Sequence, residues 1–459
     1  MNTKLFTLIV CCLMFNFGFS QTTFKKAIDI GTKDRGTYIS QTADEGFIIA
    51  GNTNKSSGNY DIALVRTDMY GDTIWTKVFG GAYAEEAYFV KETFDNGFIL
   101  AAKSNSFGGV DGKAWIIKTD AAGDTLWTRV FNSIIHHVLQ TADSSYFMVG
   151  RDSTYYNAAI LKLDQSGQLE WSKSYSFSKC FYDVVEISGD QFLVGGLSQM
   201  SQPPFSTTID LYWTNPEGDS LRVRQHGDDV DIFSFLSLQR TSDNGFILSA
   251  TKTIFYGTPD MYLHKIDSIG NTQWFQIFGD EYTYEYVYSV VQASDLGYVI
   301  TGKKEGMGLV LLKTDQYGDL LWEKSYGNQS YVTRGYCIKN TADEHFVVVG
   351  EEPKNQYSSE SDMLIMKTDE DGVITNISEN RKENTLLISP NPNQGNFYVQ
   401  IAEGDRELTI FDLHGKTVFN QKITMINGPS IVINNLKQGN YIIRVRSDKT
   451  SRAAKVVVY

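Results

Sequence analysis

The stretch TDMYGDTIW, Thr67 to Trp75, recurs along the chain with small changes. It lies between two short apolar runs, Ile62–Val65 and Trp75–Phe79, which predicts a β-hairpin. Asp68 is expected to begin a type I turn, and Gly71 to occupy the position that needs a positive φ. A calcium loop is disfavoured, because the further oxygen ligands and the distal Glu of such a loop are missing. The later copies are TDAAGDTLW, LDQSGQLEW, IDSIGNTQW and TDQYGDLLW, which begin at Thr119, Leu163, Ile266 and Thr314.

A second phrase lies upstream of each copy, as in DEGFIIAG at Asp44 and DNGFILAA at Asp95. Long amphipathic helices are absent from the sequence. Repeats of about fifty residues with four short apolar runs each are typical of β-propeller blades. The chain is therefore predicted to be all-β, with a seven-bladed β-propeller. The aromatic anchors of the seven copies are Phe47, Phe98, Phe147, Phe192, Phe246, Tyr298 and Phe346.

The large Trp of each fourth strand is expected to pack between neighbouring blades. Blade four carries Leu221 instead, and its third strand, IDLYWTN, also departs from the pattern. The last blade lacks a fourth strand, but QTTFKKAIDIG near the N-terminus resembles WTKVFGG, with Phe24 in place of Trp. We therefore expect Thr23–Ile30 to supply the outer strand of blade seven, which would remove an exposed sheet edge.

Residues 1–20 have the features of a secretory signal peptide, with Lys4 ahead of an apolar run and cleavage before Gln21. A lipoprotein signal using Cys11 or Cys12 is a weaker alternative, and no transmembrane segment is expected after signal removal. Two cysteines remain, Cys180 and Cys337, in blades on opposite sides of the ring, so no disulfide is expected. The formal net charge of −13 disfavours a nucleic-acid partner.

The propeller repeats are expected to span residues 21–376, followed by a polar linker at 377–385. Short alternating apolar runs then continue to the chain end, separated by turns such as DLHGK and LKQGN. This pattern predicts a small Ig-like β-sandwich over residues 386–459.

Four motifs of this second domain occur in a characteristic order: SPNPNQGNF from Ser389, LTIFDLHGKTVF from Leu408, LKQGNYIIRV from Leu436 and the terminal KVVVY. Together they resemble the C-terminal sorting domain of type IX secretion cargo in Bacteroidetes. The resemblance implies passage through the periplasm, recognition by the type IX machinery, removal of the domain by a sortase, and release or attachment to lipopolysaccharide. Its motif residues here are Pro390, Asn391, Pro392, Gly395, Gly439, Tyr441 and Lys455.

The first strand of each blade is expected to line the central channel, where propellers usually bind ligands. Counting twelve residues back from each anchor gives Arg35, Glu86, Ile135, Ser234, Tyr286 and Arg334, with Phe181 or Tyr182 in blade four. From this set we predict Glu86, Tyr286 and Arg334 as ligand-binding candidates. Because an error of one residue turns every strand side chain to the other face, a second register remains open, namely Tyr88, His137, Asp183, Tyr288 and Tyr336.

No catalytic, metal-binding or cofactor-binding motif is apparent in the sequence. His136 and His137 are adjacent, so strand alternation should point them to opposite faces. We therefore expect no cofactor and no metal, and a secreted or surface-displayed propeller that binds a glycan or a protein without catalysis. One alternative is a polysaccharide-degrading enzyme whose two carboxylates come from different blades, and another is a structural spacer without a ligand.

Overall fold

A computed structural model describes residues 23–54, 59–108, 112–154, 156–199, 207–227, 231–253, 257–280, 282–327, 333–355, 358–374, 388–389, 395–401, 405–412, 416–423, 430–447 and 451–458. The regular elements in these ranges are all β-strands, and none of the described residues forms a helix that could cross a membrane. The chain divides into two compact units, residues 1–375 and 376–459. The expected signal peptide (1–20) and linker (377–385) lie outside the described residues.

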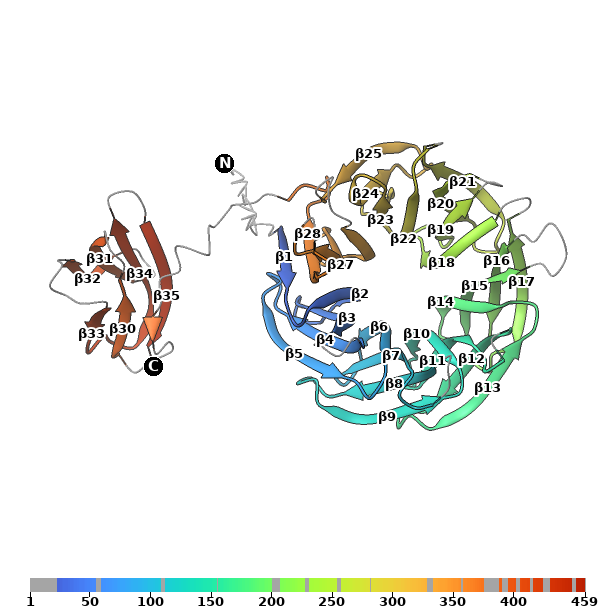
Figure 1. Cartoon of the computed structure of the whole chain (residues 1–459), viewed down its shortest axis with the longest axis horizontal. Helices are drawn as coiled ribbons and strands as arrows, with labels where there is room; N and C mark the ends of the chain where they lie inside the picture. Colours follow the sequence, from blue (N-terminus) through green and yellow to red (C-terminus); the bar gives the residue numbers. More distant parts are fainter. Residues whose placement is uncertain are drawn as a thin grey trace, which may run out of the picture. The chain divides into compact units, whose positions relative to one another are not determined.

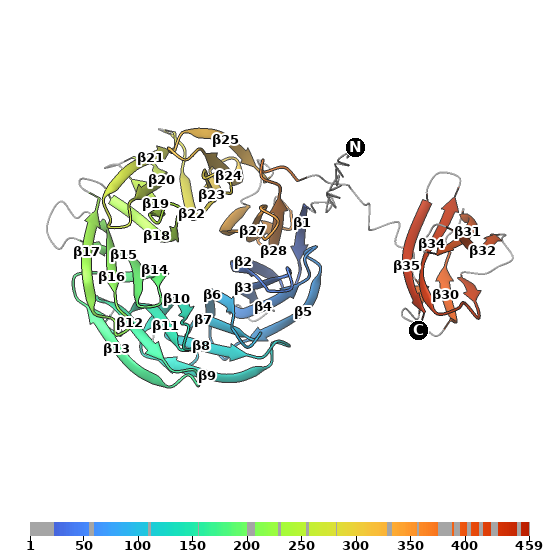
Figure 2. The ribbon, with the colours of Figure 1, turned by 180° about the vertical axis from the view of Figure 1, so that it is seen from behind.

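In the described part of the first unit, seven four-stranded antiparallel blades form a ring (Figures 1 and 2). Five blades are separate sheets, and the first and last blades are joined into one eight-stranded sheet. A single parallel bridge between Lys33 and Ser361 makes this connection. The prediction of an all-β, seven-bladed propeller is confirmed.

The strands of each blade follow one another from the channel to the periphery. The innermost strands are β2(Lys33–Gln41), β6(Glu85–Glu92), β10(Ile134–Gln140), β14(Cys180–Ser188), β18(Asp231–Arg240), β22(Glu285–Gln292) and β26(Arg334–Asn340). The second strands are β3(Phe47–Asn54), β7(Phe98–Ser104), β11(Tyr146–Arg151), β15(Gln191–Gln199), β19(Phe246–Thr253), β23(Tyr298–Lys304) and β27(Phe346–Pro353). The third strands are β4(Asp61–Thr67), β8(Lys113–Thr119), β12(Ala158–Leu163), β16(Thr207–Thr214), β20(Pro259–Ile266), β24(Gly308–Thr314) and β28(Ser361–Thr368). The outer strands are β5(Thr73–Phe79), β9(Thr125–Phe131), β13(Leu169–Tyr175), β17(Ser220–His226), β21(Thr272–Phe278), β25(Leu320–Ser325) and β1(Phe24–Ile28).

The ring closes through the N-terminal strand. β1 pairs antiparallel with β28, from Phe24 opposite Lys367 to Ile28 opposite Met363 (Figure 1). Outside the backbone ladder, Lys25 forms an ion pair with Glu352 at 2.6 Å. The N-terminal residues therefore complete blade seven, as the sequence predicts, and the edge of β28 is covered.

The turn between the third and fourth strands of blade one has the predicted geometry. Asp68 Oδ1 accepts hydrogen bonds from the amides of Tyr70 (2.9 Å) and Asp72 (2.8 Å), and Gly71 has φ +76°. The register also shifts between Arg66 and Thr67, as expected for a bulge. The recurring phrase is therefore a hairpin turn and a packing surface for the preceding blade.

That packing explains the recurring Trp. The Trp75 ring of blade one lies against Gly123 in the turn of blade two, where an added Cβ would come within 2.8 Å of the ring. In blade four Leu221 is 54% exposed, and Trp213 of the third strand takes this role against Gly270. The third strand that departs from the sequence pattern thus supplies the missing ring. The same contact is made by Trp127–Gly167, Trp171–Gly218, Trp274–Gly318 and Trp322–Gly372.

The anchor of blade three is Tyr146, not Phe147 as the sequence suggests. Tyr146 begins β11 and pairs with Leu163, just as Phe98 begins β7 and pairs with Thr119. The ring of Trp127 also meets Tyr146 edge-on, with the ring centroids 5.8 Å apart. The aromatic pair Tyr146–Phe147 hides the offset in the sequence, because either residue fits the pattern.

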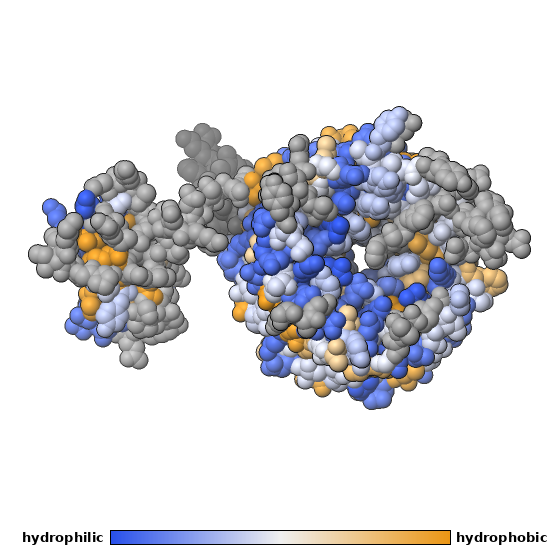
Figure 3. Space-filling model, in the orientation of Figure 1, coloured by the Kyte–Doolittle hydropathy of each residue, from blue (hydrophilic) through white to orange (hydrophobic). Residues whose placement is uncertain are grey.

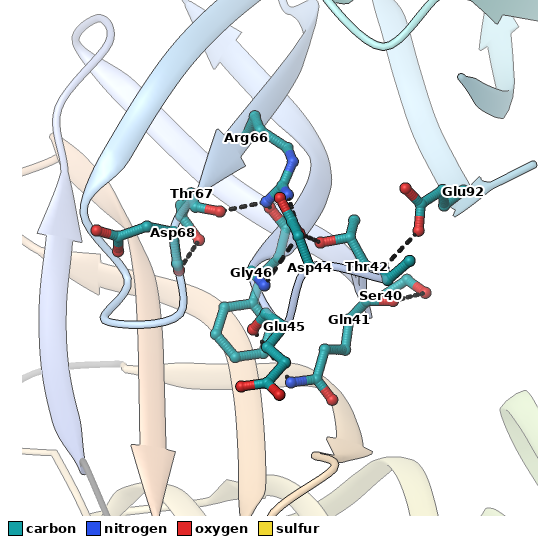
Figure 4. Close-up of polar contacts among 12 residues, drawn as sticks. Ser40, Gln41, Thr42, Asp44, Glu45, Gly46, Arg66, Thr67, Asp68 and Glu92 are labelled. Carbon is teal, nitrogen blue, oxygen red and sulfur yellow. Dashed lines mark hydrogen bonds and ion pairs between the residues drawn. The ribbon is translucent and has the colours of Figure 1, made fainter. Parts of the chain in front are cut away.

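The Asp of the second phrase holds two strands of its own blade together (Figure 4). Asp44 Oδ1 accepts hydrogen bonds from Thr42 Oγ1 (2.7 Å) and the Gly46 amide (3.3 Å), and it pairs with Arg66. Because the Arg66 side chain is only 7% exposed, this carboxylate compensates a largely buried charge. Lysine replaces arginine in the pairs Lys118–Asp95, Lys265–Asp243, Lys313–Asp295 and Lys367–Asp343.

The second unit is a small β-sandwich. One sheet has the order β29(Ile388–Ser389), β30(Phe397–Gln400), β33(Ser430–Ile433), and the other has the order β32(Thr417–Lys422), β31(Asp405–Asp412), β34(Gly439–Ser447), β35(Ser451–Val458). Its core is apolar and draws on both sheets, with Phe397 and Val399 from one and Leu408, Ile410 and Ile443 from the other. The predicted small sandwich is present.

Candidate functional site

Six innermost strands of the propeller carry a β-bulge at an equivalent point. In β6 the pairing with β7 shifts between Ala87 and Phe89, so Tyr88 is the extra residue. A bulge interrupts the alternation of side chains along a strand. The extra residues in these strands are Thr37, Tyr88, His136, Tyr182, Tyr288 and Tyr336.

All six bulge residues line one cavity in the central channel. We call this space the channel cavity; counted with the solvent that opens onto it, its volume is about 910 Å³. Figure 3 shows the channel as a hollow with a largely hydrophilic rim. Residues before the bulges (Arg35, Glu86 and Ala87) and beyond them also line the wall, the latter being Tyr38, His137, Asp183, Ser237, Ser289, Cys337 and Lys339.

The aromatic rings of the channel cavity are packed against one another. The His136 ring lies between Tyr88 and Tyr182, with centroid distances of 4.7 and 4.9 Å. Burial and the nearby charge of Arg151 lower the pKa of His136 to about 3, so this ring is neutral at physiological pH. Tyr288 and Tyr336 form a second pair at 5.1 Å. The cavity therefore has two aromatic surfaces supplied by different blades.

Both carboxylates that line the channel cavity have partners. Glu86 forms an ion pair with Arg35 at 3.0 Å and accepts a hydrogen bond from the Tyr88 hydroxyl at 3.1 Å. Asp183 contacts His137 Nδ1 and accepts hydrogen bonds from the amides of Val184 and Leu238, each at 2.9 Å. These carboxylates are held in fixed orientations by the protein itself.

Lys339 differs from the other charged groups of the cavity. Its Nζ lies 4.8 Å from the centroid of the Tyr38 ring. Among the described residues no carboxylate lies within 4.0 Å of it. Burial favours its neutral form, but Coulomb interactions with Tyr38, Cys337 and Asp183 and a hydrogen bond with the Tyr38 side chain outweigh this effect and raise the pKa of Lys339. The ammonium group is therefore charged at neutral pH and faces a cavity without an ion-pair partner.

The structure places one of the three predicted ligand-binding residues in the wall of the channel cavity. Glu86 lines the channel cavity, whereas Tyr286 and Arg334 do not. Arg334 pairs with Glu351 at 2.5 Å and lies 3.2 Å from the Tyr336 hydroxyl. It therefore contacts a residue of the cavity wall without lining the cavity itself. Every member of the second register does line the cavity: Tyr88, His137, Asp183, Tyr288 and Tyr336.

The expectation that His136 and His137 face opposite sides is wrong, since both line the channel cavity. His136 is a bulge residue, and the shift between Ile135 and His137 breaks the alternation. Ile135 itself is buried in the core, and Phe181 is buried while Tyr182 lines the cavity. The side chain of Ser234, counted back in blade five, lies outside the described residues.

One acidic group elsewhere in the described part of the chain has the spacing of a metal site. The carboxylates of Asp29, Asp34 and Asp362 lie within 4.8 Å of one another, near the ring closure. Lys354 Nζ already pairs with Asp29 at 3.0 Å and with Asp362 at 3.3 Å. This group belongs to the closure of the ring and not to the channel cavity. The cysteines Cys180 and Cys337 are both free and buried.

The C-terminal unit matches a known protein family. Residues 387–459 match the family of secretion system C-terminal sorting domains. The chain is a type IX secretion cargo. Its sorting domain directs export to the cell surface or the extracellular space, and the type IX machinery handles it. The comparison with curated proteins found no match.

Several solved structures are distantly similar to this cargo protein. They include Drosophila Plexin A in complex with Semaphorin 1b (10% identity, TM-score 0.46, covering 76% of this chain and 88% of that one). Another is the polysaccharide lyase Uly1 (10% identity, TM-score 0.48, covering 73% and 90%). A third is the BP39L lectin from Burkholderia pseudomallei (8% identity, TM-score 0.47, covering 75% and 94%). Similarities this distant assign no ligand and no activity.

Three motif residues of the sorting domain have visible structural roles. Gly395 has φ +92°, and an added Cβ would lie 2.4 Å from the carbonyl oxygen of Leu436. Tyr441 is buried and donates a hydrogen bond to the carbonyl of Lys437 at 2.8 Å. Gly439 begins β34. Pro390, Asn391 and Pro392 lie outside the described residues, as does the side chain of Lys455.

Proposed function

We propose that the propeller of this exported protein is a non-enzymatic binding module that takes a saccharide unit of a glycan into the channel cavity. The observation that carries this proposal is the convergence of bulge residues from separate blades, with Tyr88, Tyr182, Tyr288 and Tyr336 among them, on one solvent-open space. Tyrosine offers an apolar ring and a polar hydroxyl, which suits a sugar that has an apolar face and polar edges.

The wall of the channel cavity is preorganised for a ligand. The walls carry polar groups held by internal contacts, such as Glu86 by Arg35. Preorganised walls of this kind lower the entropic cost of binding.

Catalysis is less well supported than binding. A retaining or inverting glycosidase needs one carboxyl group that gives up a proton and a second that acts as nucleophile or base. Glu86 faces the guanidinium of Arg35, and Asp183 is committed to His137 and two amides. Neither carboxylate is free for the acid role.

The specific alternative is a polysaccharide-degrading enzyme in which His137 is the proton acceptor. Asp183 contacts its Nδ1 and would orient the ring, as a carboxylate orients a general-base histidine. The experiment also distinguishes two further functions. The propeller would be a structural spacer without a ligand, or a module that binds a protein loop in the channel.

The test is a glycan array followed by a hydrolysis assay on the chain without residues 1–20. Binding that is lost in Tyr88→Ala and Tyr336→Ala, but kept in Tyr317→Ala, supports the proposal. Tyr317 is a matched control because it is 65% exposed, outside the channel cavity. Cleavage of a bound glycan that is lost in His137→Ala would support the enzyme instead. No glycan binding would contradict the proposal.

A further inference from the structure

The charged side chains that line the channel cavity are not all held in ion pairs. The two acidic groups, Glu86 and Asp183, are both satisfied by protein partners. Of the two lysine or arginine side chains in the wall, Arg35 is paired with Glu86 and Lys339 has no carboxylate within 4.0 Å among the described residues. The formal charges of the wall balance, but among the described residues Lys339 is the wall cation without an ion-pair contact.

Lys339 lies at the opposite end of the cavity from the Arg35–Glu86 pair. Arg35 and Glu86 are near the start of their strands, whereas Lys339 is near the end of β26. Because equivalent strands run in the same direction around the ring, a ligand would meet an internally neutralised pair at one end and an unpaired ammonium at the other. The aromatic bulge residues lie between these ends.

We propose that the ligand of the channel cavity is an anionic saccharide, either a uronate or a sugar sulfate, whose negative group pairs with Lys339. This inference rests on the proposed function and narrows it. An ammonium in a partly enclosed, low-dielectric space gains more from an anionic partner than it would in water.

The neighbouring residues favour an anion at this point. Tyr38 contacts the ammonium with its ring and through a hydrogen bond, and no carboxylate of the described residues lies within 4.0 Å of Nζ. Lys91 on the nearby strand β6 adds a second positive charge, and enclosure together with Lys339 lowers the pKa of Lys91. Two ammonium groups close enough to affect each other both attract an anion, and Glu186 near Lys91 and Asp183 near Lys339 offset part of that attraction.

A uronate and a sugar sulfate would be recognised by the same chemistry. A carboxylate of a uronate and a sulfate ester both present oxygens that accept hydrogen bonds from an ammonium group. In either case the sugar ring would rest on a tyrosine face, with Tyr288 and Tyr336 as one such surface. Lys339 would thus determine specificity, and the tyrosines would supply most of the contact area.

The experiment measures binding of three tetrasaccharides by calorimetry: a galacturonate, a sulfated galactan and a neutral galactan. It uses the chain without residues 1–20 and its variants Lys339→Gln, Lys339→Arg and Lys91→Gln. Lys339→Gln should weaken the binding of at least one anionic probe about tenfold, equivalent to about 1.4 kcal/mol, and leave any neutral binding unchanged. Lys339→Arg should retain most of the affinity.

Lys91→Gln is the matched control, because it removes a charge close to the cavity but outside its wall. It should change affinity less than Lys339→Gln does. Added salt should weaken anionic binding in the parent chain and have less effect in Lys339→Gln. The difference between the carboxylate and sulfate probes identifies which source the cavity prefers.

Two results would overturn the inference in distinguishable ways. If neutral and anionic probes bind equally and Lys339→Gln changes neither, the anion preference is wrong while the saccharide-binding proposal survives. If no probe of any charge binds, both the inference and the proposed function fail.

Discussion

The ring of Phe24 lies against Gly71, at the place where an added Cβ would come within 2.5 Å of the ring. Phe24 comes from the N-terminal strand β1 and Gly71 from the hairpin turn of blade one. The same contact joins Trp75 to Gly123 in the next pair of blades. Phe24 therefore stands where other blades carry Trp, and it connects the two ends of the propeller chain.

Replacing Phe24 with Ala should destabilise the propeller. Phe24 is 6% exposed, and Phe→Ala in a core usually costs about 3–5 kcal/mol. Chemical denaturation measures the loss of unfolding free energy. Phe24→Trp should restore most of it, because Trp fills this position elsewhere in the ring. Phe177→Ala, at an 83% exposed site, is the control and should change little. Equal stability of Phe24→Ala and the parent would mean that β1 does not close the ring.

The ion pairs formed by the Asp of the second phrase, such as Asp95–Lys118, should make the free energy of unfolding fall in acid. Partial burial opposes ionisation of Asp95, but hydrogen bonds from Thr93 and Lys118 outweigh it and lower the carboxyl pKa. A pKa that is lowered on folding stabilises the protein above the ordinary value of about 4 and loses this effect as pH falls through the folded value. We expect the unfolding free energy to decrease below pH about 4, and to do so less in the Asp95→Asn/Lys118→Met double variant. A pH profile unchanged by the double variant would contradict this account.

At neutral pH, Asp95→Ala should cost about 2 kcal/mol or more, because it leaves the buried Lys118 ammonium without its carboxylate. Asp124→Ala is the matched control: its partner Lys77 is 34% exposed, and exposed pairs contribute about 1 kcal/mol or less. Denaturation curves of the two variants should therefore separate. Equal losses would show that the burial of Lys118 does not matter.

Leu296 is a site where a substitution should stabilise the protein. It has φ +69°, while Asn96 and Asn244 occupy the equivalent positions in other blades. Asparagine tolerates this left-handed conformation better than leucine does. Because Leu296 is 44% exposed, little packing is lost. We expect Leu296→Asn to add roughly 0.5–1 kcal/mol and Leu296→Ala to add less. A melting temperature that falls in Leu296→Asn would show that the leucine side chain makes a needed contact.

Export should depend on the C-terminal unit. Deleting residues 387–459 removes the sorting domain and should leave the propeller in the periplasm of the native host, measured by cell fractionation. The propeller has its own cores and strand ladders, so its melting transition should persist and exclude misfolding as the cause. Surface display of the truncated chain would contradict the role of the sorting domain.

The sequence was sufficient to predict the ring of blades but not to predict the wall of the channel cavity, and the reason is physical. Blade repeats are visible because turns need Asp and Gly at fixed spacing and because the inter-blade contact needs a large ring, as with Trp75 and Gly123. Even the closure by Phe24 follows from that rule. The bulges carry no such signal: Tyr88 and His136 are extra residues in otherwise regular strands. Counting twelve residues back from an anchor therefore reached Glu86 but missed Tyr88, Tyr288 and Tyr336, which only the second register contained.

The charge pattern of the site was also hidden in the sequence. Arg334 looked like a free ligand-binding group, yet its partner Glu351 comes from the neighbouring strand β27. Lys339 was not singled out, because only the three-dimensional structure shows that its ammonium meets Tyr38 and no carboxylate among the described residues. Pairing across strands decides which charges are available, and a single sequence does not reveal it.

The most direct test of the central claim, that the channel cavity is a saccharide site, is a crystal structure of the chain without residues 1–20 soaked with the tetrasaccharide that binds most tightly. The account predicts density for a sugar ring inside the channel cavity, in contact with Tyr336 or Tyr88 and with its anionic group near Lys339. Density confined to the outer strands or the blade turns, with an empty channel in a crystal whose channel is open to solvent, would contradict it.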